Sequence, residues 1–312
     1  MLLRETEMKP GPKACIDTMS VEDAGHALIA AQEKAVRAVN SAMPQLRQAA
    51  ELAADTLCSG GAVNYVAAGS SGLMALSDGV ELPGTFGIAQ EQIRIFMAGG
   101  VPIDGEMAAE IEDDLSGADD IVDRFGIDDL VIALSASGST PYSCEIAKKA
   151  HAKGIKVIAI ANNPATPLLD LADVAIVLPT RAEVLAGSTR LGAGTAQKVA
   201  LNVISTLAAV QLGHVFQGMM VNLKVDNAKL RGRAVGIVAN IACVSEHEAE
   251  RALIASARDL KLAVLLAKGC DAATSKSLLA EHQGRLGGVS WCARKPAKSI
   301  IHNHKFFIGR LK

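Results

Sequence analysis

Two serine-rich turns contain the residues of this chain that are best suited to binding an anion. The first serine turn is Gly69-Ser70-Ser71-Gly72, and the second serine turn runs from Ser135 to Pro141. Each follows a short apolar run and opens a segment expected to be helical. Free backbone N–H groups and the helix dipole favour an anion there, and hydroxyl groups add donors. Two such turns in one domain indicate a phosphorylated small molecule, although N-capping alone explains any single serine.

The elements that position these turns predict an α/β fold. The expected strands are residues 62–68, 93–97, 130–134, 156–161 and 174–178. Because strands alternate with helical segments, we expect right-handed crossovers and a five-stranded parallel sheet, covered on both faces as a three-layer αβα sandwich. Ligands bind at the carboxyl ends of the strands in such sheets, so both serine turns are expected at one edge.

The rest of the chain divides into segments of different character. Residues 1–60 are expected to form an extended arm followed by two amphipathic helices, of which the first is capped by Ser20. Within the sheet domain we expect a short helix over 73–78, an irregular loop over 79–87 and a helix over 104–112. The predicted domains are the N-terminal arm and helices (1–60), a sugar-phosphate-binding domain (61–224), a small C-terminal helical module (225–285) and a basic tail (286–312).

Composition excludes several classes of function. The 312 residues carry a net charge of −2 and only 3% aromatic residues, which argues against binding to nucleic acid. No apolar run is long enough to span a membrane, and the first residues lack the pattern of a signal peptide, so a cytoplasmic protein is expected. The six cysteines contain no Cys-x-x-Cys pair, which argues against a disulfide framework or a zinc site.

Three motifs in the chain form a specific combination. They are Ala68-Gly69-Ser70-Ser71-Gly72, Ser137-Gly138-Ser139-Thr140-Pro141-Tyr142, and the third motif, Gly187-Ser188-Thr189-Arg190-Leu191-Gly192-Ala193-Gly194-Thr195-Ala196-Gln197-Lys198. Together they resemble those of a known family, the N-acetylmuramic acid 6-phosphate etherases of the sugar isomerase (SIS) superfamily. The resemblance extends over about residues 20 to 285.

This resemblance implies a homodimer with the site near the subunit interface, and a reaction that uses no metal or organic cofactor. The reaction removes the lactyl ether from the 3-position of a muramic acid 6-phosphate, giving N-acetylglucosamine 6-phosphate and D-lactate. Opening of the sugar ring acidifies the hydrogen on C2. A base then takes this proton, an acid protonates the leaving ether oxygen, and water adds back. Two carboxyl groups in different protonation states can perform these steps.

The resemblance also assigns residues to these roles. Glu81, in Glu81-Leu82-Pro83-Gly84-Thr85-Phe86-Gly87, is the expected general acid. Glu112, twelve residues beyond Gly100, is the expected base, with Glu110 as the fallback. Both were expected at the same sheet edge as the serine turns. The expected substrate-binding residues are Ser70, Ser71, Ser137, Ser139, Thr140, Ser188, Thr189 and Arg190.

Three positions depart from the family pattern, because Leu73, Ser139 and Gly192 stand where the family carries basic residues. Charge-assisted bonds from such residues are strong and specific in geometry. The hypothesis is therefore a divergent etherase that acts on N-acetylmuramic acid 6-phosphate or a related 6-phosphosugar. Two alternatives stay open at this point: an SIS-type phosphosugar isomerase, and a non-catalytic sugar-phosphate sensor that regulates a partner.

Overall fold

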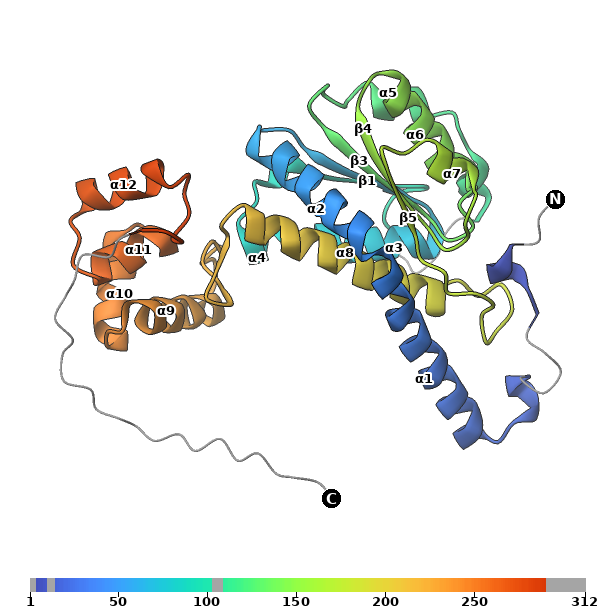
Figure 1. Cartoon of the computed structure of the whole chain (residues 1–312), viewed down its shortest axis with the longest axis horizontal. Helices are drawn as coiled ribbons and strands as arrows, with labels where there is room; N and C mark the ends of the chain where they lie inside the picture. The colour runs from blue at the N-terminus through green and yellow to red at the C-terminus, as the bar shows by residue number, and fades with distance from the viewer. Residues whose placement is uncertain (1–3, 10–14, 103–108, 290–312) are drawn as a thin grey trace. The chain divides into compact units, whose positions relative to one another are not determined.

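The computed structural model describes residues 4–9, 15–102 and 109–289. Its main feature is a sheet of five parallel strands in the order β2-β1-β3-β4-β5 (Figure 1). The strands are β1 (Val63–Ala67), β2 (Ile93–Met97), β3 (Leu130–Ser135), β4 (Lys156–Ala161) and β5 (Val174–Val177). Every residue of β1 and β3 is buried, as continuous apolar runs in a doubly covered parallel sheet require. The predicted fold class is confirmed.

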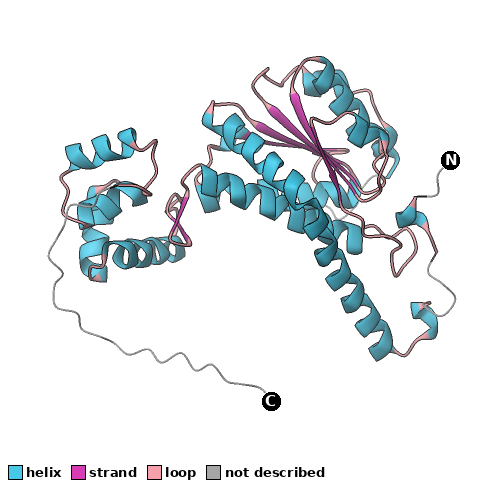
Figure 2. Ribbon diagram, viewed as in Figure 1, coloured by secondary structure: helices cyan, strands magenta, loops and turns pink. Residues whose placement is uncertain are grey.

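Helices cover both faces of the sheet (Figure 2). The helices of this part are α1 (Val21–Ala38), α2 (Met43–Cys58), α3 (Gly69–Gly79), α4 (Leu82–Phe86), α5 (Ala118–Val122), α6 (Pro141–Ala152), α7 (Pro167–Asp170) and α8 (Gly192–Gln211). Side chains alternate between the two faces along each strand. On one face, Ile132 and its equivalents pack against α2, α3 and α8. On the other face, Val131 and its equivalents pack against α5, α6 and α7.

The strand order creates a switch point between β1 and β3. The chain passes from β1 to β2 on one side, then returns to β3 on the other side of β1. The connections that leave β1 and β3 therefore cover opposite faces. The region outside the carboxyl ends of these two strands, called the crevice, is where ligands bind in such folds. Because the two serine turns follow β1 and β3, they flank this crevice, as the sequence predicts.

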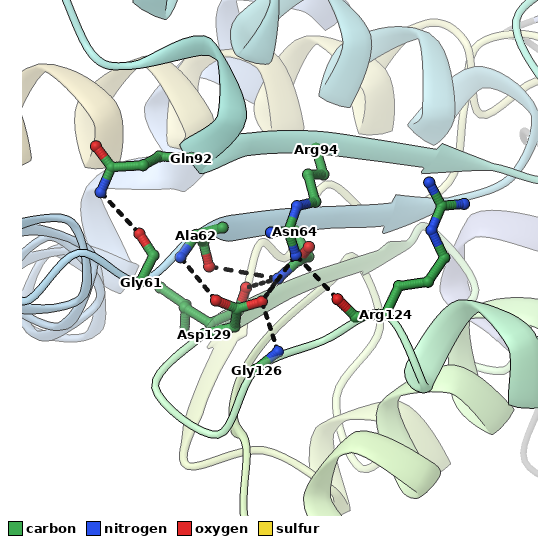
Figure 3. Close-up of polar contacts among 9 residues, drawn as sticks. Gly61, Ala62, Asn64, Gln92, Arg94, Arg124, Gly126 and Asp129 are labelled. Carbon is green, nitrogen blue, oxygen red and sulfur yellow. Dashed lines mark hydrogen bonds and ion pairs between the residues drawn. The ribbon is translucent and has the colours of Figure 1, made fainter.

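At the opposite, amino edge of the sheet, Asp129 joins three strands (Figure 3). Its carboxylate accepts hydrogen bonds from the backbone N–H groups of Ala62 (2.8 Å) and Gly126 (3.0 Å). It also accepts one from Asn64 Nδ2 (3.3 Å) and pairs with Arg94 Nη1 (3.0 Å). Asn64 lies in β1 and Arg94 in β2, while Asp129 immediately precedes β3. This buried carboxylate therefore fixes the register at which the three strands begin.

The N-terminal segment is not the extended arm that was predicted. It contains the 3-10 turns η1 (Glu5–Glu7) and η3 (Ile16–Thr18), and Thr6 is fully buried. The helices after it follow the prediction. Ser20 Oγ accepts the N–H of Asp23 at 3.1 Å and so caps α1, as its position suggested.

The chain divides into two compact units, residues 1–230 and 231–312. The helices of the C-terminal part are α9 (Ala228–Ala242), α10 (Glu246–Ala255), α11 (Leu260–Ala267) and α12 (Ala272–Glu281). The predicted capping box is present: Ser245 Oγ accepts the N–H of Glu248, whose side chain accepts the N–H of Ser245. A hairpin of β6 (Val215–Phe216) and β7 (Met219–Met220), which follows α8, was not predicted. Residues 290–312 of the expected basic tail lie outside the described residues.

Candidate active site

The first serine turn is the first turn of a helix. We expected that helix to begin at Leu73, but α3 begins at Gly69, whose φ of +52° a residue with a side chain rarely adopts. Ser70 is half-buried and Ser71 is buried. Ala68 occupies the N-cap position and offers no side-chain acceptor, so within the described residues no side chain caps this end of α3. The turn thus presents uncapped backbone donors beside two hydroxyl groups.

Glu112 lies directly against this turn. A Cβ placed on Gly69 would overlap Glu112 Oε1, so the carboxylate occupies the space that the glycine leaves open. Glu112 lies in the 3-10 turn η6 (Ala109–Asp113), which packs against α6. The structure thereby brings the predicted base to the crevice between β1 and β3. The side chain of the fallback Glu110 and most of the predicted 104–112 helix lie outside the described residues.

The surroundings of Glu112 raise its pKa. The side chain is half-buried, and this burial, followed by the charge of Asp113, raises the pKa of Glu112 above its ordinary value. A carboxyl group with a raised pKa has a greater affinity for a proton than an exposed one. The assignment of Glu112 as the base stays a prediction, and its contact with the first serine turn is the observation on which that prediction can build.

The second serine turn is organised by Ser135, which sequence reasoning assigned only to the turn. Ser135 Oγ accepts the N–H of Gly138 (3.0 Å) and hydrogen-bonds with Thr140 Oγ1 (2.8 Å) and Ser137 Oγ (3.2 Å). Ser137 Oγ in turn lies 3.3 Å from Ser139 Oγ. Ser135 is buried, whereas Ser137, Ser139 and Thr140 are half-buried. The predicted binding hydroxyls therefore form one connected cluster at the start of α6, supported from below by Ser135.

Gly138 is required by the shape of this turn. Its φ is +71°, and a Cβ at this position would overlap the side chain of Thr166. Thr166 Oγ1 is buried and has no hydrogen-bond partner among the described residues. Leu168 N–H donates to Gly138 O at 3.0 Å, which fixes the turn against the start of α7. The close packing holds the hydroxyl cluster in one conformation.

Glu81 lies away from this crevice. It occupies the N-cap position of α4, so the expected irregular loop is a short helix, and its side chain is exposed. Glu81 follows the C-terminal end of α3, whereas Gly69 lies at its N-terminal end with Glu112 beside it. The ten steps from Gly69 to Gly79 give α3 a rise of about 15 Å, and Glu81 lies two residues beyond its last residue. The length of α3 therefore separates Glu81 from the contact between Gly69 and Glu112 within one chain, and the roles of the two glutamates stay predictions.

The end of α3 that precedes Glu81 is anchored by a buried carboxylate, Asp78. It accepts hydrogen bonds from Tyr65 Oη (2.8 Å), Asn202 Nδ2 (2.7 Å) and Ser205 Oγ (3.0 Å). Burial raises the pKa of Asp78, and hydrogen bonds from all three partners oppose this rise. Asp78 thus joins α3 to β1 and α8, so the backbone that carries Glu81 has a fixed position.

The third motif forms the start of α8, and an internal anion already caps it. Glu183 is buried, and its carboxylate accepts the N–H groups of Gly192 (2.9 Å) and Ala193 (2.8 Å). Sequence reasoning gave Glu183 no role; the signal was an acid nine residues before a glycine-rich helix start. Ser188 and Thr189 are half-buried, and Arg190 is exposed. No described contact brings these three to the serine turns, so their role in binding stays a prediction.

A cavity of ≈ 380 Å³ lies beside this cap. Its lining includes Lys34 of α1, Thr180, Glu183 and Gly192. It contains neither Glu112 nor a residue of either serine turn. The cavity is therefore adjacent to the third motif and separate from the crevice at the switch point.

Two further observations limit the chemistry of the described residues. In residues 4–9, 15–102 and 109–289, no group of three His, Cys, Asp or Glu side chains is placed to hold a metal ion. No helix in these ranges has both the length and the apolar character needed to cross a bilayer. The groups that the described residues contribute at the crevice are hydroxyls, backbone N–H donors and the carboxyl group of Glu112.

Curated relatives match most of the chain. The N-acetylmuramic acid 6-phosphate etherase of Enterobacter sp. (strain 638) is 39% identical over 252 residues, which cover 80% of this chain and 85% of the relative. The etherases of Deinococcus radiodurans and Klebsiella aerogenes are 38% and 36% identical, and cover 85% and 89% of this chain and 88% and 94% of their own lengths. The chain belongs to this etherase family. The resemblance found in its motifs is confirmed.

Two domain families also match this member of the etherase family. The SIS domain matches residues 105–209, and the C-terminal lid domain of glucokinase regulatory protein matches residues 217–267. A solved structure, the phosphoheptose isomerase from Francisella tularensis, aligns with 61% of this chain and 97% of its own at 19% identity and a TM-score of 0.44.

The three positions that depart from the pattern of the etherase family lie in different parts of the fold. Leu73 is half-buried on α3, and Ser139 belongs to the hydroxyl cluster of the second serine turn. A Cβ at Gly192 would lie 3.0 Å from Glu183 Oε2, so a basic side chain at this position would start beside that carboxylate. The basic residue that the family carries at position 192 would therefore lie beside the Glu183 carboxylate that caps α8. By contrast, Ser139 leaves the second serine turn without a basic residue of its own.

Proposed function

We propose that this chain is a carbon–oxygen lyase that cleaves the lactyl ether of N-acetylmuramic acid 6-phosphate, or of a related 6-phosphosugar. The products are N-acetylglucosamine 6-phosphate and D-lactate. The observation that carries the proposal is the position of Glu112, a half-buried carboxyl group with a raised pKa against the first serine turn. The membership in the etherase family supports the choice of substrate.

The chemistry follows from the groups at the crevice. The serine turns bind the phosphorylated, ring-opened sugar, whose C1 aldehyde makes the C2 hydrogen acidic. Glu112 takes that proton, and the electron pair forms a C2–C3 double bond as the C3–O bond breaks. A general acid protonates the departing lactate oxygen, and water then adds at C3 to give the product. This sequence needs no electron transfer, and we propose that it uses no metal or organic cofactor.

We propose that Glu81 is the general acid and that a partner subunit supplies it. One sugar has its C2 and C3 a single bond apart, so the base and the acid must converge on the same small region. The length of α3, about 15 Å from Gly69 to Gly79, separates Gly69 from the end of the helix that Glu81 follows within one chain. A homodimer in which Glu81 of one copy approaches Glu112 of the other satisfies the chemistry, because a two-fold interface builds two such sites at once.

Release of D-lactate tests the activity directly. The purified chain is incubated with N-acetylmuramic acid 6-phosphate, and D-lactate and N-acetylglucosamine 6-phosphate are measured. We expect both products in equal amounts. Formation of a ketose phosphate without lactate would identify an isomerase instead. Ligand-dependent thermal stabilisation without turnover would identify a sugar-phosphate sensor, and either result would overturn the proposal.

Mixing two inactive variants tests the shared site. Glu81→Gln and Glu112→Gln are each expected to be inactive as homodimers. If the variants are unfolded together and refolded, half of the dimers are mixed, and one site in each of these carries both native glutamates. We expect about a quarter of the native activity. No recovery in mixed dimers would contradict a site shared between subunits.

The predicted location is part of the same proposal. The substrate is a phosphorylated sugar, and the described helices contain no membrane span. We propose that the chain acts in the cytoplasm, where sugar phosphates are retained.

A further inference from the structure

The N-terminal arm is fixed to the second serine turn by a buried amide. Asn163 follows β4, and its Nδ2 donates to Ala136 O and to Thr6 Oγ1, both at 2.9 Å. The N–H of Thr6 also donates to Asn163 Oδ1 at 3.4 Å. Thr6 and Asn163 are both buried. The Asn163 side chain thus binds the N-terminal arm through Thr6 and the second serine turn through Ala136.

The turn formed by the arm extends along the carboxyl edge of the sheet. The N–H of Glu7 donates to Arg4 O at 3.0 Å, which closes η1 around the buried Thr6. Glu7 Oε2 lies 3.3 Å from the position of a Cβ on Gly187, at the start of the third motif. The acid of this turn therefore faces the third motif, and the arm connects that motif with the second serine turn.

Arg4 is the N-cap residue of η1, two residues before Thr6, which Asn163 holds beside Ala136 of the second serine turn. Cys144 belongs to the first turn of α6, and its Sγ is 3.9 Å from Gly138 O. Burial raises the pKa of Cys144, and the positive charge of Arg4 lowers it. Arg4 is half-buried, and within the described ranges no carboxylate forms an ion pair with it. A half-buried guanidinium without an anion is costly unless a ligand supplies the charge.

The second serine turn lacks a cation of its own. Its donors are the hydroxyls of Ser137, Ser139 and Thr140 and the first N–H groups of α6, which no side chain caps. Thr166 Oγ1, buried and without a partner in the described residues, packs against this turn at Gly138. Neutral donors alone bind a dianion less strongly than donors combined with a guanidinium, whose planar fork matches phosphate oxygens.

We propose that Arg4 is a substrate-binding residue, which the arm positions so that its guanidinium holds the phosphate group of the sugar phosphate at the second serine turn. The inference rests on the proposed function for the identity of the sugar, but not for the binding of phosphate. Thr6 and Asn163 are the positioning residues, because they fix the arm without reaching the ligand.

Matched substitutions on the arm test the proposal. Arg4→Gln removes the charge, Arg4→Lys keeps it without the fork, and Lys9→Gln removes one exposed charge from the same arm. For lactate release, we expect Arg4→Gln to raise KM roughly 10- to 100-fold with kcat within about threefold of native. Arg4→Lys is expected to lie between the two, and Lys9→Gln to match the native chain. A KM for Arg4→Gln equal to that of Lys9→Gln would overturn the proposal, as would a loss confined to kcat.

A binding experiment separates this inference from the proposed activity. Thermal stabilisation is measured with inorganic phosphate, N-acetylglucosamine 6-phosphate and unphosphorylated N-acetylglucosamine. Arg4→Gln is expected to lose the stabilisation by inorganic phosphate and by N-acetylglucosamine 6-phosphate. Its response to unphosphorylated N-acetylglucosamine is expected to match that of the native chain. If the native chain binds N-acetylglucosamine 6-phosphate and releases no lactate, a loss in Arg4→Gln still supports Arg4 while the etherase proposal fails. Thr6→Val, which frees the arm with Arg4 intact, is expected to weaken phosphate binding in the same direction. Unchanged phosphate binding in both variants would reject the role of the arm.

Discussion

The two ends of the parallel sheet use buried polar groups in opposite ways. At the amino edge, the Asp129 carboxylate receives four donors, from Ala62, Asn64, Arg94 and Gly126, and all four belong to the chain itself (Figure 3). At the carboxyl edge, the hydroxyls of the second serine turn bond mainly to one another, and among the described residues no side chain caps the start of α3 or α6. The first arrangement is complete without a ligand. The second keeps donors available, which is what binding an external anion requires.

The largest effect that would sharpen this contrast is expected at Glu112. Glu112→Gln keeps the shape of the side chain but removes the base, and we expect lactate release to fall about 10²- to 10⁴-fold. The midpoint of thermal unfolding should stay within a degree or two, because the half-buried side chain has no described ion pair to lose.

Asp114→Asn is the matched control, since this exposed acid lies two residues away. Its activity is expected to be native. A large loss of stability in Glu112→Gln would mean that the carboxyl edge also stabilises the fold, which would contradict the difference between the two edges.

The reverse result is expected at the amino edge. Asp129→Ala leaves the buried N–H group of Ala62 and the N–H group of Gly126 without this acceptor and removes the partner of Arg94. The free energy of unfolding should fall by about 3 kcal/mol, measured by urea denaturation. Activity per folded molecule should remain native.

Asp128→Ala, at the adjacent exposed position, controls for the loss of one acid and is expected to change stability by less than about 0.5 kcal/mol. If Asp129→Ala lowered kcat under conditions in which the protein is fully folded, the amino and carboxyl edges of the sheet would be coupled rather than separate.

A smaller effect is expected from the hydroxyl beneath the second serine turn. Ser135→Ala removes the acceptor of the Gly138 N–H and the contacts with Ser137 and Thr140. We expect KM to rise roughly 10-fold, because the binding hydroxyls lose their fixed positions.

Ser143→Ala serves as the comparison, since Ser143 is buried in α6 and donates to Leu134 O instead. The two variants should differ in KM, measured by steady-state kinetics. Their midpoints of thermal unfolding should be lowered by similar amounts. Equal KM values would show that Ser135 acts only on stability.

The smallest effect concerns pH. A base works in its ionised form, so the rate should fall as the pH drops through the raised pKa of Glu112. The charge of Asp113 is the second cause of this raised pKa, after burial. Asp113→Asn removes that charge, lowers the pKa of Glu112 and should move the acid limb of the kcat/KM profile to lower pH. A shift to higher pH would contradict the assignment of Glu112 as the base.

The sheet and its helices were largely predictable because local patterns determine them. The run Lys156–Ala161 became β4 and the segment beginning at Pro141 became α6 within the predicted limits. Both are marked by continuous apolar character or by proline at the first helical position. The same reasoning misplaced the start of α3, because it treated Ser70 and Ser71 as a turn before the helix. It also left out α4, although Pro83 and Gly87 mark its two ends.

The candidate site was predictable only in its parts. The motifs identified the hydroxyls and the two glutamates, but the separation of Glu81 from Glu112 depends on the direction in which α3 runs from β1. Ser135 was assigned to the second serine turn but not to the binding residues, and it is the last residue of β3. The pairing of Thr6 with Asn163 joins residues 157 positions apart, and no local pattern contains such a distance. Side-chain partners far apart in the sequence are decided by tertiary packing, which periodicity does not encode.

That pairing also orders events during synthesis. Thr6 leaves the ribosome long before Asn163 exists, and at about 5–20 residues per second the 157 residues between them take roughly 8–30 s to make. During this interval β1, β2 and β3 can assemble, while the arm has no partner on which to settle. The carboxyl edge is consequently completed late, after the strands that support it. A nascent chain arrested before β4 would hold a partly formed sheet with its first residues still unattached.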